Sequence, residues 1–209
     1  MHMPSTMWTT ILQFHRDPDR VKDFVVRRYR QPVVEFARRQ GLKDEDAEDI
    51  AQEVFLRVTR ESFLKKADQI RGKFRTVLLA VTKNVISSWR RYELAGMRDR
   101  RREVSLDGGL VVPDETASDP EFDKLWVKNL MTQAMDRLKI DPGTEALKLQ
   151  LEGLSYQEIA DRLGRKVTDV TNFIHRSKEK LKKEFEKLIA EYSTREDVAA
   201  EISELRKFL

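Results

Sequence analysis

The sequence contains no cysteine, and this absence excludes several kinds of site at once. Without cysteine the chain can form no disulfide, no thiolate metal site and no cysteine nucleophile. Histidine is also scarce, because His2, His15 and His175 are scattered over separate segments and have no metal-ligand spacing. We therefore expect neither a metal ion nor another cofactor.

Long apolar runs are missing as well. No stretch reaches the roughly 20 apolar residues that a membrane-spanning helix needs. The amino-terminal stretch MHMPSTMWTT lacks the charged-then-apolar order of a signal peptide. We expect a cytoplasmic protein with no membrane insertion.

Strand patterns are missing too, whereas helical patterns cover most of the chain. With 209 residues, 40% hydrophobic and 36% charged, the chain has the length of one domain or of two small ones. The net charge is only +4, but acidic and basic residues gather in different segments. This composition predicts an all-α protein whose charged surfaces differ along the chain.

The stretch from Leu151 to Phe185 carries the clearest signals of local structure. Ser155 and Glu158 have the spacing of a capping box, which starts a helix. Gly164 follows where a left-handed residue would end that helix. Thr168 can cap a second helix, whose apolar residues recur at helical spacing. Two helices joined by a tight glycine turn make a helix-turn-helix.

The other face of this second helix is polar and basic. Lysine and arginine side chains there can neutralise phosphates, and the start of such a helix can reach base edges in a major groove. A solvated surface helix would have the same composition, so the hairpin alone leaves both interpretations open. The basic domain that precedes it favours nucleic acid. The basic face comprises Asn172, His175, Arg176, Lys178, Lys180, Lys182 and Lys183.

The amino-terminal part of the chain predicts three helices in succession. Asp17 and Pro18 are typical of a helix start, and we expect Pro32 to end this helix and to begin a second one, closed by Gly41. Asp44 can cap a third helix, with apolar residues on one side and acidic residues on the other. Such an acidic surface suits a basic or polar partner.

A fourth helix follows a loop at residues 65–72, and its apolar stripe runs from Phe74 to Trp89. Arginines gather near its carboxyl end, with Trp89 and Tyr92 among them. Aromatic rings that stack on bases, beside arginines that neutralise the backbone, would form a platform for single-stranded DNA. The alternative is that Trp89 packs inward and the arginines are solvated. The arginines are Arg90, Arg91, Arg98, Arg100, Arg101 and Arg102.

The helical pattern stops from Val104 to Pro120, where glycine, proline, serine and threonine residues are typical of a linker. We therefore expect one domain at residues 1–103, a linker at 104–120 and a second domain at 121–192. Helices that start near Glu121 and at Asp141 would support the helix-turn-helix.

A C-terminal helical extension is expected at residues 193–209. Ser193 and Glu196 repeat the capping-box spacing, and an apolar stripe follows them. A helix this short is marginal in water unless its stripe is covered. We favour docking on the second domain; the alternative is docking on the first domain or on a partner.

Two of these stretches together resemble the extracytoplasmic-function sigma factors of bacterial RNA polymerase. They are DAEDIAQEVF, from Asp46 to Phe55, and LEGLSYQEIADRLG, from Leu151 to Gly164, with the basic helix after it. The resemblance covers roughly residues 17–186. It implies a sigma region 2-like helical bundle and a sigma region 4-like helix-turn-helix domain. It also implies a protein that binds core RNA polymerase, recognises promoter DNA and directs transcription initiation.

The resemblance further implies which residues make these contacts. Ser88 stands where the family often has aspartate, Phe173 where arginine is common and Ser177 where alanine is common. Because of these departures, the family pattern leaves the promoter sequence open. The implied contacts are Asp46, Asp49, Gln52, Glu53 and Phe55 for core polymerase; Asn84, Ser88, Trp89, Arg90 and Arg91 for the minus-ten element; and Lys166, Thr168, Asn172, Phe173, His175, Arg176 and Lys178 for the minus-35 element.

Two other classes of protein compete with this interpretation. A two-domain helix-turn-helix regulator would share the DNA-binding hairpin but would not bind core polymerase. An enzyme would need a nucleophile and base pair or a phosphate loop, and neither is visible, so we expect no enzymatic activity. An anti-sigma protein is a further class of partner, although no residue identifies one.

Overall fold

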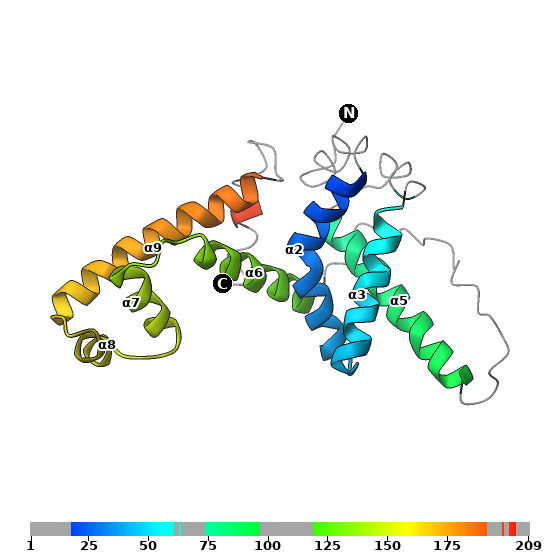
Figure 1. Cartoon of the computed structure of the whole chain (residues 1–209), viewed down its shortest axis with the longest axis horizontal. Helices are drawn as coiled ribbons and strands as arrows, with labels where there is room; N and C mark the ends of the chain where they lie inside the picture. Colours follow the sequence, from blue (N-terminus) through cyan, green and yellow to red (C-terminus); the bar gives the residue numbers. More distant parts are fainter. Residues whose placement is uncertain are drawn as a thin grey trace. The chain divides into compact units, whose positions relative to one another are not determined.

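The computed structural model describes residues 18–60, 63, 74–96, 119–191, 198 and 201–203 (Figure 1). Within these ranges the regular elements are helices and no strand is present. The chain forms two compact units: unit 1 comprises residues 1–129 with 192–209, and unit 2 comprises residues 130–191. The prediction of an all-α protein with two small helical domains is confirmed. No helix in the described ranges is long and apolar enough to cross a membrane.

Unit 1 is built on the helices α2 (Pro18–Arg39), α3 (Asp44–Val58) and α5 (Phe74–Gly96). In Figure 1, α3 lies between α2 and α5, and it contacts both. Apolar residues at steps of three and four place one face of each helix in a common core. The most buried of these side chains include Val33, Phe36, Ala47, Val54 and Leu78, each fully enclosed.

The prediction that Pro32 ends the first helix is wrong, because α2 continues through it to Arg39. Proline has no backbone N–H, so inside a helix it leaves the carbonyl four residues earlier without a donor. Here that carbonyl belongs to Arg28, and the side-chain amide of Asn129 donates to it at 2.8 Å. A residue from a distant segment thus replaces the missing helical hydrogen bond.

The first half of α6 (Pro120–Asp136) is part of unit 1. The ring of Trp126 stacks on Tyr29 of α2 with a centroid distance of 5.9 Å, and Phe122 meets Phe36 edge to face. Because these aromatic residues are buried against α2, the compact units divide between Asn129 and Leu130, within α6, and not at residue 121.

The C-terminal segment docks on unit 1, so the favoured docking on the second domain is wrong. Glu201 is only 3% exposed, and its carboxylate accepts a hydrogen bond from Arg75 of α5. The alternative of docking on the first domain is the one that this buried ion pair selects. The loop at residues 65–72 and the linker up to residue 118 lie outside the described residues.

Unit 2 contains α7 (Pro142–Leu151), α8 (Tyr156–Leu163) and α9 (Val167–Ala190). The expected start of α7 is confirmed, because the Asp141 carboxylate caps it by accepting from the Thr144 N–H at 2.8 Å. Each pair of these three helices is in contact. Their shared core includes Leu147, Ile159, Val170, Ile174 and Leu188.

Candidate functional site

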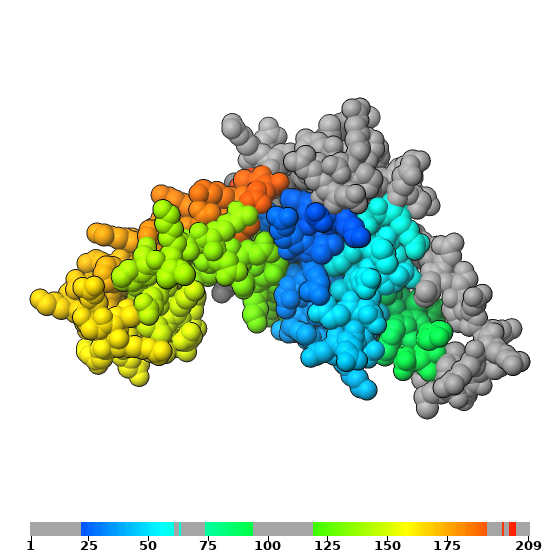
Figure 2. Space-filling model, in the orientation of Figure 1, coloured from blue at the N-terminus to red at the C-terminus, as the bar shows by residue number. Residues whose placement is uncertain are grey.

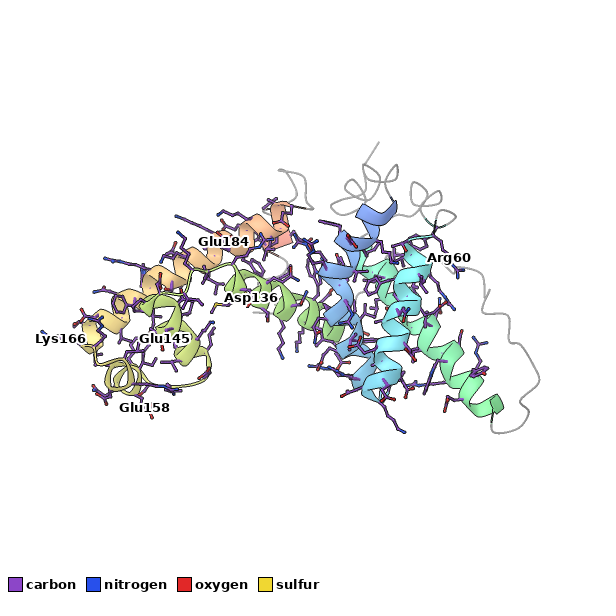
Figure 3. All side chains as sticks on the ribbon, in the orientation of Figure 1. Arg60, Asp136, Glu145, Glu158, Lys166 and Glu184 are labelled. Atoms are coloured by element: carbon purple, nitrogen blue, oxygen red, sulfur yellow. The ribbon has the colours of Figure 1, made fainter. Side chains whose placement is uncertain are left out.

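The start and end of α8 confirm the predicted helix-turn-helix. The Ser155 hydroxyl accepts from the Glu158 N–H at 3.3 Å, and the Glu158 carboxylate accepts from the Ser155 N–H at 2.7 Å. The Ser155 hydroxyl also donates to the Glu158 carboxylate at 2.6 Å, and this hydrogen bond, followed by the one from the Ser155 N–H, holds the pKa of Glu158 below its usual value. Gly164 ends α8 with a φ of 61°, where a residue with a Cβ would be strained. Figure 3 labels Glu158 on α8 and Lys166 just before α9.

The predicted capping role of Thr168 is wrong. α9 begins at Val167, its N-cap residue is Lys166, and no side chain caps this helix end. Thr168 lies exposed in the first turn. The amino end of a helix attracts anions because its N–H dipoles point outward, so an exposed first turn with Lys166 beside it suits a phosphate.

The exposed side of α9 carries most of the predicted DNA contacts. Val170, Ile174, Ser177 and Leu181 are buried on the opposite side. Phe173 is half-buried between the two, so its ring is partly used in packing. The exposed set, which we call the reading face, comprises Lys166, Thr168, Asn172, His175, Arg176 and Lys178.

Lys180 is committed to a contact within unit 2. Its Nζ donates to the Asp141 carboxylate at 2.8 Å. The hydrogen bond from Lys180, followed by the bond from the Thr144 N–H, lowers the pKa of Asp141 to about 2. The sequence pattern predicted that Lys180 belongs to the basic face that can neutralise phosphates. In the structure its ion pair with Asp141 joins the amino end of α7 to α9.

The predicted minus-ten residues lie on the carboxyl half of α5, with different surroundings. Asn84 is exposed and Trp89 is half-buried, so Trp89 belongs neither fully to the core nor fully to the surface. Arg90 donates to the backbone carbonyl of Gln40 at 2.5 Å, and Arg91 donates to the Ser88 hydroxyl at 3.1 Å. Arg90 therefore braces the turn after α2. Arg98, Arg100, Arg101 and Arg102 lie outside the described residues.

Tyr92 is 58% exposed, which makes it the aromatic residue of this region with the freer ring. The sequence places Tyr92 in the aromatic platform, but the family resemblance implies no contact for it. Tyr92 lies beyond Trp89, where the predicted apolar stripe ends, and this position was the sequence signal for an exposed ring.

The acidic side of α3 presents most of the residues predicted to bind polymerase. Asp49 and Gln52 are exposed, Asp46 is half-buried, and Glu53 accepts from Arg57 at 2.7 Å. In Figure 2, α3 (cyan) lies at the molecular surface. These side chains point away from the core because the apolar residues of α3 occupy its other side.

Phe55 is buried in the core of unit 1, with only 4% of its surface exposed, so the structure does not bring it to this surface. Leu56, for which neither the sequence pattern nor the resemblance predicted a contact, is 42% exposed. It lies four residues after Gln52, hence on the same side of the helix. Leu56 does not fall on the buried apolar stripe of α3. This position outside the stripe was the signal in the sequence that its side chain would be exposed. Among the described residues no group of histidine, aspartate or glutamate side chains could hold a metal ion.

Comparison with known proteins assigns a family to this architecture. Residues 25–94 match the family Sigma-70 region 2, and residues 144–181 match the family Sigma-70, region 4. The first match covers α3 and nearly all of α5, and the second covers α8 and the part of α9 up to residue 181.

Several curated proteins are similar to this chain. The ferric citrate uptake sigma factor FecI of Escherichia coli is 31% identical, over 64% of this chain and 73% of FecI. The RNA polymerase sigma factor YlaC of Bacillus subtilis is 25% identical, over 83% of this chain and 95% of YlaC. The ECF RNA polymerase sigma factor SigE of Mycolicibacterium smegmatis is 27% identical, over 77% of this chain and 60% of SigE. The chain therefore belongs to the sigma-70 family, as a sigma factor of the extracytoplasmic-function type, and it directs the initiation of transcription.

Proposed function

We propose that this sigma factor binds core RNA polymerase through an acidic face on α3, which comprises Asp46, Asp49, Gln52, Glu53 and Leu56. The observation that carries this proposal is the exposed Leu56 among acidic and polar side chains. An apolar side chain ringed by polar groups is the usual centre of a protein interface. Phe55 supports the face from inside the core and is not part of it.

The two units would contact different parts of the promoter. On α5, exposed Asn84, Arg91 and Tyr92 would hold unpaired bases and their backbone at the minus-ten element, because aromatic rings stack on bases and arginine neutralises phosphates. On unit 2, the reading face would enter the major groove of the minus-35 element. Asn172 has the amide that can bond an adenine edge, whereas Arg176 and Lys178 are suited to phosphates.

Run-off transcription with purified core polymerase on genomic fragments tests the function directly. We expect defined transcripts that require this protein. If a folded protein gives none on any fragment, the alternative of a helix-turn-helix regulator that does not bind polymerase becomes the better account.

A cytoplasmic location and control by an anti-sigma protein belong to the same proposal.

The acidic face is tested by the substitution Gln52→Ala in a titration with core polymerase. Interfaces depend on few residues, so we expect a loss of about 1 to 3 kcal/mol in binding free energy. Gln31→Ala is the matched control, because Gln31 is also an exposed glutamine and lies on α2. Unchanged affinity of folded Gln52→Ala would remove α3 from the interface.

A further inference from the structure

Unit 1 contains a cluster of four buried charged side chains from four separate segments. They are Arg28 of α2, Arg75 of α5, Asp123 of α6 and Glu201 of the C-terminal segment, and each is between 3% and 5% exposed. All four charges act on the hydroxyl group of Tyr29, whose pKa is raised above its usual value, chiefly by burial. The cluster therefore joins the segment with Glu201 to the helices of unit 1.

Arg75 joins the C-terminal segment to α6. Its Nε donates to the Asp123 carboxylate at 2.9 Å, and its Nη1 donates to the Glu201 carboxylate. Its guanidinium also lies over the ring of Trp126, with 5.1 Å between Cζ and the ring centroid. One guanidinium group thus binds both Asp123 of α6 and Glu201 of the C-terminal segment.

The cluster contains two positive and two negative groups, so its buried charges balance. Charges in a protein interior are tolerated when they are paired, and removing one partner of a buried pair is strongly destabilising. If Glu201 leaves, the cluster keeps two guanidinium groups, Arg28 and Arg75, but only one carboxylate, Asp123, so its buried charges no longer balance. Docking of the C-terminal segment and docking of the first half of α6 should therefore support each other.

We propose that the segment around Glu201 is an intramolecular latch that holds the first half of α6 on unit 1. α6 runs from unit 1 into unit 2 as one helix, so with the latch closed this helix is the connection between the units. Release of this half of α6 would change the connection between the units, and the latch would thereby regulate promoter binding by the two units, a consequence that rests on the proposed function.

Hydrogen–deuterium exchange on the full chain tests the latch without polymerase or DNA. In Glu201→Gln we expect the backbone amides of residues 121–129 to exchange about tenfold faster or more than in the unsubstituted protein. Glu191→Gln is the matched control, because it weakens an exposed ion pair with Arg137 in unit 2. Unchanged exchange at residues 121–129 would overturn the proposal. An equal acceleration across α3 would also overturn it, because Glu201 would then stabilise unit 1 as a whole.

Promoter binding by holoenzyme tests the regulatory consequence. We expect Glu201→Gln to bind a promoter fragment several-fold more tightly than the unsubstituted protein, while Glu191→Gln does not. Faster exchange at residues 121–129 with equal or weaker promoter binding would overturn the regulatory role. An unsubstituted protein that forms no holoenzyme would instead contradict the proposed function, and the exchange experiment would still decide the latch.

Discussion

Asn129 donates a hydrogen bond from its side-chain amide to the backbone carbonyl oxygen of Arg28, at an Nδ2–O distance of 2.8 Å. This carbonyl is the one that Pro32, four residues later, cannot bond. This hydrogen bond explains how α2 continues through a proline. It also holds Asn129, the last residue of α6 that belongs to unit 1, against α2.

The double-mutant cycle of Asn129→Ala and Pro32→Ala tests this relationship. Asn129→Ala should lower the free energy of unfolding by about 1 to 3 kcal/mol, because it leaves the Arg28 carbonyl without this donor. In the Pro32→Ala background the loss should be smaller, because the alanine would supply a backbone N–H to the same carbonyl. Denaturant unfolding of the four proteins measures the coupling. Equal losses in both backgrounds would show that Asn129 does not compensate for the proline.

The approach of α7 to α9 gives a second prediction, at Gly143. A Cβ at this position would lie 2.7 Å from the Ser177 hydroxyl oxygen and 3.3 Å from the Phe173 carbonyl oxygen. Gly143→Ala should therefore destabilise the protein by about 1 to 3 kcal/mol, although alanine in a helix normally stabilises relative to glycine. Thermal unfolding measures the change.

Ser177→Ala provides the control for Gly143. Among the described residues the buried Ser177 hydroxyl has no hydrogen-bond partner, so its removal should leave stability unchanged or raise it by up to about 1 kcal/mol. It should also recover part of the loss caused by Gly143→Ala. A double variant that is no more stable than Gly143→Ala would show that the strain arises elsewhere.

The reading face should contain two kinds of DNA contact. Lys178→Ala should weaken binding to all duplexes similarly and reduce the slope of log K against log salt by about 0.9, the value for one phosphate. Asn172→Ala should cost about 1 to 3 kcal/mol on the preferred promoter and almost nothing on random DNA. Filter binding or fluorescence titration at several salt concentrations separates the two.

Lys180→Ala is the comparison within the same helix. Because Lys180 is paired with Asp141, it should affect the stability of unit 2 more than the salt dependence of DNA binding. A salt slope that falls as much for Lys180→Ala as for Lys178→Ala would place Lys180 on the DNA-binding surface.

The Asp141 carboxylate should make part of the stability of unit 2 depend on pH. Its folded-state pKa of about 2 lies below the usual value of 3.8, so the ionised form is favoured by folding. This contribution is fully present above about pH 4 and is lost as the pH falls towards 2. It should be small, because the two side chains of the ion pair are 34% and 54% exposed.

Unfolding of Asp141→Asn across this pH range measures the contribution. The difference in stability between the two proteins should be constant at neutral pH and should shrink below pH 4. NMR titration of the Asp141 carboxyl gives the pKa independently. A difference that is unaffected by acid would mean that the ionised carboxylate does not contribute.

Local signals in the sequence were sufficient for the helix-turn-helix. The capping box of Ser155 and Glu158, the left-handed Gly164 and the Asp141 cap depend on residues within one or two turns of each other. Their geometry follows from backbone hydrogen bonding, whatever the rest of the chain does. Periodicity likewise placed Phe55 in the apolar stripe of α3, and the family motif alone assigned it to polymerase.

Helix caps without a hydrogen-bonding side chain were harder to predict. Asp44 and Thr168 have the chemistry of N-cap residues. The N-cap residues are lysines instead: Lys43 for α3, one residue before Asp44, and Lys166 for α9, two residues before Thr168. The polar residue lies instead in the first turn of each helix.

The sequence by itself determined the helical class, the apolar faces of the helices, the helix-turn-helix and the family. Only the tertiary structure decided that α2 continues through Pro32 and that the segment with Glu201 docks on unit 1. The first depends on a hydrogen bond from Asn129 to Arg28, 101 residues apart, and the second on the pair of Arg75 and Glu201, 126 residues apart. The physical reason is that a proline or a terminal glutamate is tolerated at a buried position when a partner satisfies it, and sequence spacing does not reveal a distant partner.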